Sequence, residues 1–126
     1  MRNWMFGTLA LAAAVLPFAA QADDSMTVVG VPSGALAANS LIAGQYQAAA
    51  ERLSQRTPDS INDPARLINL GNAYAGMGRM ADARDAYRAA AYAPDEMLAL
   101  ADGSEAPARQ IARRALRRLN TAYAMK

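Results

Sequence analysis

The feature that most constrains this chain is an internal repeat with a period of 34 residues. Residues 44–53 and 78–87 align at this offset, each beginning with a glycine. Self-similarity at a fixed period of about 20–50 residues is typical of repeat architectures, in which each copy buries its apolar face by stacking on a neighbour. The repeat therefore predicts two equivalent units, about residues 30–63 and 64–97. The matching positions are Leu36 with Leu70, Ala37 with Gly71, Gly44 with Gly78, Ala49 with Ala83, and Leu53 with Tyr87.

Each unit is expected to be a pair of antiparallel helices. In the second unit apolar residues recur every three or four positions, the spacing of a helix with one buried face. Asp63 is the expected N-cap, with Pro64 at the first helical position, and Gly76 and Gly78 are expected to end that helix. The predicted buried positions are Leu67, Leu70, Tyr74 and Met77 in the first helix, and Met80, Ala83, Tyr87 and Ala90 in the second.

Small residues are expected where the two helices of the second unit cross, at Gly71 and Ala83. The pattern of the first unit is weaker. It predicts helices over residues 32–43 and 45–56, with Tyr46, Ala49 and Leu53 on the inner face of the second helix.

The second unit carries a motif that resembles the tetratricopeptide repeat (TPR): Asn69-Leu70-Gly71-Asn72-Ala73-Tyr74, followed by Gly78, Ala83, Tyr87 and Ala90. The first unit matches only in its latter half, and the usual proline stands one place early, at Pro94. The resemblance covers about two thirds of residues 23–126. It implies an all-α fold of about two helical hairpins, in which the first helix of each pair lines a concave groove. It places Asn69 and Asn72 in that groove.

An amide side chain offers two donors and an acceptor, so Asn69 and Asn72 are suited to bind the backbone of an extended peptide. The alternative is that both are consensus residues of the repeat and hold no ligand. No lysine or arginine accompanies them in the motif, so a groove built around a carboxylate end is not supported.

Two short segments flank the repeat. Residues 27–31 are rich in β-branched side chains, and residues 97–101 are apolar and precede the turn dipeptide Asp102-Gly103. Either the region from Pro94 to Leu100 forms a stray helical turn, or the two segments are short strands that pair. Both alternatives stay open at the level of sequence.

A last helix is predicted over about residues 104–124, with Ser104 at its start and Pro107 in its first turn. It is expected to cap the open face of the repeat. Its apolar arc contains Ile111, Ala112, Ala115, Leu116, Leu119, Ala122 and Tyr123, and its opposite arc contains Arg109, Arg113, Arg114, Arg117 and Arg118. Between Asp23 and Glu105, eleven acidic residues face six arginines, whereas the segment beyond has six basic residues and no acid.

The N-terminal residues 1–22 have the layout of a secretory signal peptide. Met1-Arg2 is followed by an apolar run from Trp4 to Leu16 and by the small-residue pattern Ala20-Gln21-Ala22. A membrane anchor is disfavoured because this run has 13 residues, against the roughly 20 needed to span a bilayer. Cleavage after Ala22 is therefore expected, leaving one domain of residues 23–126 in the periplasm.

The composition argues against catalysis. The chain has no histidine and no cysteine, which removes zinc-type clusters and the usual nucleophile–base pairs. Asp82 and Asp85 are three residues apart on a predicted helix, but they stand among arginines and are better explained as an ion-paired surface. No enzyme activity, metal or cofactor is expected.

Two binding functions remain. The first is a periplasmic adaptor or scaffold that docks a protein or peptide in the groove, with self-association as a further means of completing so small an array. The second is an electrostatic binder, whose arginine face rests on anionic lipid headgroups or lipopolysaccharide phosphates. Nucleic acid is disfavoured because the protein is expected to be exported.

Overall fold

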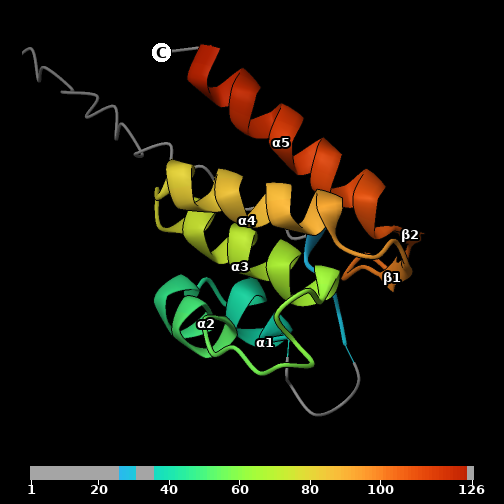
Figure 1. Ribbon diagram of the computed structural model, residues 1–126. Helices are drawn as coiled ribbons and strands as arrows, with labels where there is room; N and C mark the ends of the chain where they lie inside the picture. Colours follow the sequence, from blue (N-terminus) through green and yellow to red (C-terminus); the bar gives the residue numbers. More distant parts are fainter. Residues whose placement is uncertain (1–25, 31–35, 125–126) are drawn as a thin grey trace, which may run out of the picture.

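The chain folds into five helices and one short β-hairpin within residues 26–30 and 36–124, the parts that the computed structural model describes. The helices follow one another in space in chain order, from α1 and α2 through α3 and α4 to α5, and the hairpin lies at the N-terminal end of α5 (Figure 1). The prediction of a small, mostly helical fold is confirmed. The elements are α1 (Ala38–Ile42), α2 (Tyr46–Leu53), α3 (Pro64–Gly76), α4 (Met80–Tyr92), β1 (Met97–Ala99), β2 (Glu105–Pro107) and α5 (Ala108–Ala124).

The expected signal peptide lies outside the described residues. Within those residues, none of the helices has both the length and the apolar character needed to span a bilayer.

Helix α3 begins and ends where local sequence rules place it. The Asp63 carboxylate accepts a hydrogen bond from the backbone N–H of Ala65 at 3.0 Å, as an N-cap side chain does. At the other end, Gly78 has a φ of 75°. Its N–H donates to the Ala75 carbonyl, and the N–H of Arg79 donates to the Tyr74 carbonyl. These two bonds form a Schellman motif, which favours glycine because an L side chain is strained at positive φ.

The same turn closes α1, 34 residues earlier. Gly44 has a φ of 74°, its N–H donates to the Leu41 carbonyl, and the N–H of Gln45 donates to the Ser40 carbonyl. Equivalent positions of the repeat therefore adopt equivalent backbone conformations and reverse the chain in the same way.

Both helices of the first unit are shorter than predicted. In the described part of residues 32–43 the helix starts only at Ala38, because Ala37 has a left-handed φ of 51°. The Leu36 carbonyl accepts a hydrogen bond from the Asn69 side chain at 2.9 Å instead of from a helical N–H. Helix α2 ends at Leu53 rather than at 56, since the Leu53 carbonyl is bound by the guanidinium of Arg66 at 2.7 Å.

Arg66 holds the loop between α2 and α3. Its side chain is buried and donates to three backbone carbonyls, those of Leu53, Ser60 and Ile61, at 2.7, 2.8 and 3.1 Å. Burial, together with the nearby Arg56, lowers the pKa of Arg66 from its usual value. A guanidinium has several fixed donors, so these carbonyls offset much of the cost of taking the charge out of water.

The last helix begins four residues later than predicted. Residues 105–107 pair with β1 in an antiparallel register that sets Leu98 opposite Ala106, and Gly103, with a φ of 85°, makes the turn. Ser104 therefore belongs to the hairpin. The cap of α5 comes from Asp95, whose carboxylate accepts from the N–H of Arg109 at 3.0 Å.

Of the two readings for the flanking segments, pairing is the correct one. Val28 forms an antiparallel bridge with Leu100. The N–H of Val29 donates to the Ala99 carbonyl at 3.0 Å, and the N–H of Ala101 donates to the Thr27 carbonyl at 2.9 Å. The predicted segment ended at Val31, which lies outside the described residues. We call residues Met26–Gly30 the N-terminal segment.

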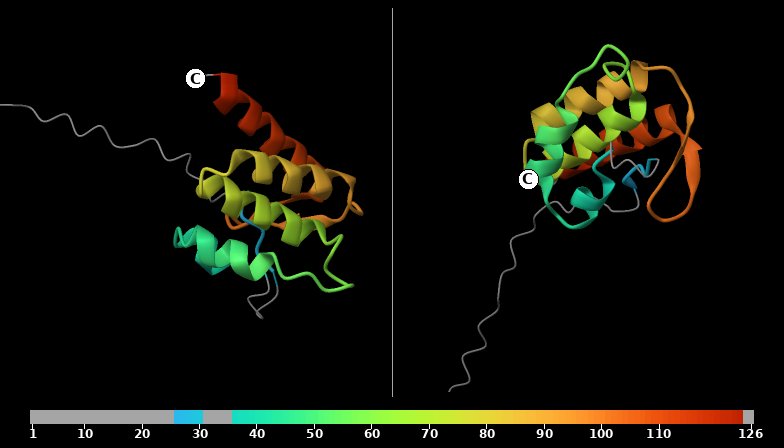
Figure 2. Two further views of the ribbon diagram at one scale, coloured as in Figure 1. Left: turned by 60° about the vertical axis from the view of Figure 1, so that its left-hand side comes forward. Right: turned by 90° about the horizontal axis from the view of Figure 1, so that it is seen from below.

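Two apolar clusters form the interior, one on each side of α3. The first joins the N-terminal segment to α3, α4, the hairpin and α5, and includes Val28, Ile68, Leu100 and Ile111. The second joins α1, α2, α3 and α4, and includes Leu41, Leu53, Leu70 and Ala86. In the left view of Figure 2, α3 and α4 lie between α1 and α2 on one side and α5 on the other.

The predicted helix stripes are confirmed in both units, with Tyr46, Tyr74, Met77 and Met80 partly buried and the other positions buried. Gly71 is small because a ring lies against it: an added Cβ would lie 2.5 Å from Cε1 of Tyr87. On α5, Ala122 departs from the predicted apolar arc and is exposed.

Candidate functional site

Helix α3 presents two asparagines on one face. Asn69 and Asn72 are three residues apart, so their side chains lie side by side along the helix. Their exposed fractions are 0% and 2%. Neither amide faces open solvent, because the N-terminal segment lies against this face.

The Asn69 amide is matched to the backbone of one residue. Its Oδ1 accepts from the N–H of Val28 at 2.8 Å, and its Nδ2 donates to the carbonyl of Val28 at 2.7 Å. The second Nδ2 hydrogen serves the Leu36 carbonyl at 2.9 Å. The Asn69 carboxamide thus binds both the N–H and the carbonyl of Val28, as a neighbouring β-strand would. These two bonds hold the segment in an extended conformation.

Asn72 continues the contact along the segment. Its Nδ2 donates to the Met26 carbonyl at 3.1 Å and lies 3.4 Å from Oδ1 of Asn69. Its Oδ1 accepts from the hydroxyl of Tyr87 on α4 at 2.7 Å. Burial raises the pKa of Tyr87 well above its usual value, and Arg118 opposes this effect. The phenol is therefore kept neutral, as a donor must be. We call Asn69, Asn72 and Tyr87 the amide clamp.

The opposite edge of the N-terminal segment is held by the strand that continues β1. The bonds to Ala99 and Ala101 lie on that side, so both backbone edges of the segment are paired. No buried side-chain polar atom lacks a hydrogen-bond partner in residues 26–30 and 36–124. Since a buried amide left without a partner costs about 1–3 kcal/mol, the hydrogen bonds to the N-terminal segment offset the cost of burying the two amides beneath it.

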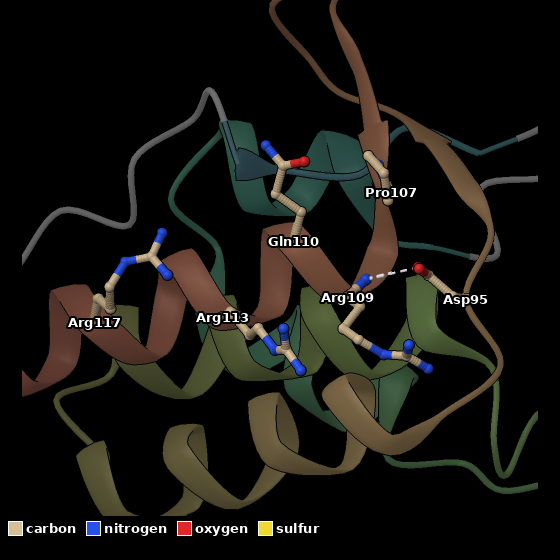
Figure 3. A pocket seen from close by; sticks show the side chains of 6 residues that line it. All are labelled: Asp95, Pro107, Arg109, Gln110, Arg113 and Arg117. Atoms are coloured by element: carbon tan, nitrogen blue, oxygen red, sulfur yellow. Dashed lines mark hydrogen bonds between the residues drawn. The ribbon is translucent and has the colours of Figure 1, made fainter.

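The predicted basic face of α5 divides into two groups. Arg109, Arg113 and Arg117 follow one another at intervals of four residues and line a depression that is open to solvent, whereas Arg114 and Arg118 do not line it. Figure 3 shows the three side chains along α5. The remaining lining residues are Asp95, Pro107 and Gln110.

The three arginines differ in how firmly they are held. Arg109 is half-buried, and its Nε donates to the Ala91 carbonyl at 3.1 Å. Arg113 and Arg117 are exposed, and neither has an ion-pair partner among the described residues. Their charges are therefore available for an anion, while Asp95 places one negative charge at the end of the depression nearest the start of α5 (Figure 3).

The two carboxylates of α4, Asp82 and Asp85, are both accessible to solvent. Asp82 makes an ion pair with Arg79 at 2.8 Å, as expected for this surface, whereas Asp85 is exposed and has no ion pair among the described residues. No group of acidic residues suited to a metal ion occurs in the part of the chain that the structure describes.

Comparison with protein-family models, curated proteins and solved structures gives no match. Function therefore has to be inferred from the sites themselves.

Three features of these sites were missed at the level of sequence: the occupant of the amide clamp, the hydroxyl of Tyr87, and the cap from Asp95. A signal existed for Tyr87. A tyrosine in a buried stripe needs a partner for its hydroxyl, and Asn72 is a polar residue on the preceding helix. The other two features depend on contacts between segments distant in the chain, for which the sequence shows no local pattern.

Proposed function

We propose that this protein is a non-enzymatic periplasmic protein–protein interaction module of TPR type, an adaptor or scaffold. In this proposal α1 with α2, and α3 with α4, are two repeat units, and α5 is the capping helix. The recurrence of the Schellman turn at Gly44 and Gly78 supports this assignment.

The observation that carries the proposal is the amide clamp. Asn69 and Asn72 bind the backbone of an extended segment and make no use of its side chains in these hydrogen bonds. Addition of an extended strand to the edge of a sheet is a known mode of peptide recognition, and here the chain's own N-terminal segment is that strand. Such a site serves binding rather than bond-breaking.

The test uses the mature chain, residues 23–126, as bait in chemical cross-linking of a periplasmic fraction, together with light scattering of the purified protein. Recovery of the same partner by the wild type and by an Arg113→Gln/Arg117→Gln variant is expected if the partner does not use the basic face. A monomer that recovers no partner above an unrelated exported protein would count against an adaptor role.

A second candidate function is binding of an anionic envelope component, and the depression along α5 favours it. Each basic residue near an anionic membrane surface contributes about 1 kcal/mol. Removing Arg113 and Arg117 is therefore expected to weaken binding to phosphatidylglycerol vesicles by about 2 kcal/mol, or roughly 30-fold.

The matched control for vesicle binding is Arg52→Gln/Arg56→Gln. These two arginines are also exposed, so the control removes the same charge from another surface. A loss confined to the α5 variant would assign the binding to the depression. Equal losses in both variants would show that only net charge matters.

A further inference from the structure

We propose that the N-terminal segment is an exchangeable occupant of the amide clamp, and that the ligand that replaces it is an extended, uncharged peptide strand with an aliphatic side chain at the position of Val28. This inference rests on the proposed function, because it names the class of partner that the amide clamp takes.

The backbone contacts require an extended strand but no particular sequence. Asn69 binds the N–H and carbonyl of Val28, and Asn72 binds the carbonyl of Met26. On the other edge, the bonds to Ala99 and Ala101 also go to the main chain. Any extended peptide offers the same groups in the same order, so another strand can make these hydrogen bonds equally well.

The side-chain contacts select for apolar character. Val28 is 1% exposed and packs in the cluster that contains Ile68, Leu100 and Ile111. The polar side chains buried close to it, Asn69, Asn72 and Tyr87, are already engaged in hydrogen bonds. A charged side chain at the Val28 position would lose its water without gaining a partner. Along the segment, Val29 is only partly buried and Gly30 is exposed, so selectivity is expected at positions 26 to 28.

The site favours exchange over simple opening. If the N-terminal segment left without a replacement, water would take over the hydrogen bonds of Asn69 and Asn72, but the apolar side chains packed against Val28 would be exposed, which is costly. A replacing strand covers those side chains again. The resident segment competes at the effective concentration of a tethered ligand, about millimolar. The apparent dissociation constant of a free peptide is its intrinsic constant divided by the fraction of sites that the segment leaves open.

The experiment weakens the resident segment without touching the clamp. Val29→Pro removes the N–H that donates to Ala99 and leaves position 28 in the extended conformation that precedes a proline. Val29→Ala is the matched control, because it shortens the same side chain and keeps the N–H. The probe is a fluorescein-labelled peptide with the sequence of residues 25–31, which has no charged side chain, and its binding is followed by anisotropy. The proline variant is expected to bind it about fivefold more tightly than the alanine variant, the factor that one net hydrogen bond provides.

A disulfide lock tests the same idea in the opposite direction. The hydrogen bonds flank the Val28–Leu100 bridge, which makes it a non-hydrogen-bonded antiparallel pair with Cα atoms about 4.5 Å apart. That distance suits a disulfide, and the chain has no other cysteine. Val28→Cys/Leu100→Cys is expected to lose peptide binding at least tenfold when oxidised and to regain it on reduction, with the helical signal in circular dichroism unchanged.

Equal peptide binding by the oxidised and reduced forms would overturn the proposal, as would the absence of binding to both the reduced form and the Val29→Pro variant. The proposed function is judged separately. If the oxidised variant still captures the periplasmic partner of the wild type, the protein is an interaction module whose partner uses another surface.

Discussion

Replacing Asn69 with alanine is expected to lower the free energy of unfolding by about 3 kcal/mol. The change removes three hydrogen bonds, to the N–H and carbonyl of Val28 and to the carbonyl of Leu36. Each contributes about 1 kcal/mol net, and more where the remaining partner is buried. The side chain is 0% exposed, so water cannot take its place without rearrangement. Against a total stability of about 5–15 kcal/mol for a small domain, this is a large loss.

The assay is thermal and urea unfolding of residues 23–126, followed by far-ultraviolet circular dichroism. For a domain near this size, 1 kcal/mol shifts Tm by about 4–8 °C, so Asn69→Ala is expected to lower Tm by about 12–24 °C. Asn120→Ala is the control. Asn120 is exposed on α5, and such a change is expected to alter stability by no more than about 0.5 kcal/mol.

The Asn69→Asp variant tests the acceptor and donor roles of the amide separately. A carboxylate keeps an acceptor for the N–H of Val28 but brings negative charge towards the carbonyls of Val28 and Leu36, which need donors. It is expected to be at least as destabilising as alanine at neutral pH. A loss below about 1 kcal/mol for either variant would refute the reasoning, because the segment would then be held by apolar packing alone.

Three further changes have defined outcomes. Tyr87→Phe leaves Oδ1 of Asn72 unpaired and is expected to cost about 1–3 kcal/mol by urea unfolding. Because burial raises the pKa of Tyr87, the wild type should also lose stability as the pH rises above about 10, where the unfolded phenol ionises, and the phenylalanine variant should lose less. Gly71→Ala forces a Cβ against the ring of Tyr87 and is expected to cost about 1–3 kcal/mol, measured as a lower Tm. Arg66→Ala removes three carbonyl contacts and is expected to cost about 3 kcal/mol and to speed limited proteolysis within residues 54–63; unchanged cleavage would contradict the role of Arg66.

Helix α3 could be predicted almost to the residue because its signals are local. The apolar spacing, the Asp63 cap and the glycine at 78 all act within a few residues of the positions that they determine. The start of α5 could not be predicted in this way. Ser104 has the composition of a cap, but pairing with β1 draws residues 105–107 into a strand, and the carboxylate that caps the helix comes from Asp95.

In the candidate site too, features set by local sequence could be predicted, and contacts between distant segments could not. Whereas the structure buries Asn69 and Asn72 against the chain's own backbone, the sequence suggested only that they bind an extended peptide in an open groove. It was not sufficient to identify that backbone as residues 26–30, since the pairing joins parts of the chain that are 41 and 46 residues apart. Likewise, a helical wheel grouped five arginines on α5, but only three of them line the depression.

The bridge between Val28 and Leu100 joins positions that are 72 residues apart, which has a consequence for the order of folding. Contacts of long sequence separation form late, because the intervening loop must be closed first. The helical hairpin of α3 and α4 needs only neighbouring residues and is expected to form earlier. In pulsed hydrogen-exchange labelling, amides of α3 and α4 should become protected before those of Val28 and Val29. As the chain emerges during synthesis, Val28 would then stay unpaired until Leu100 has been made and the helices between them have formed.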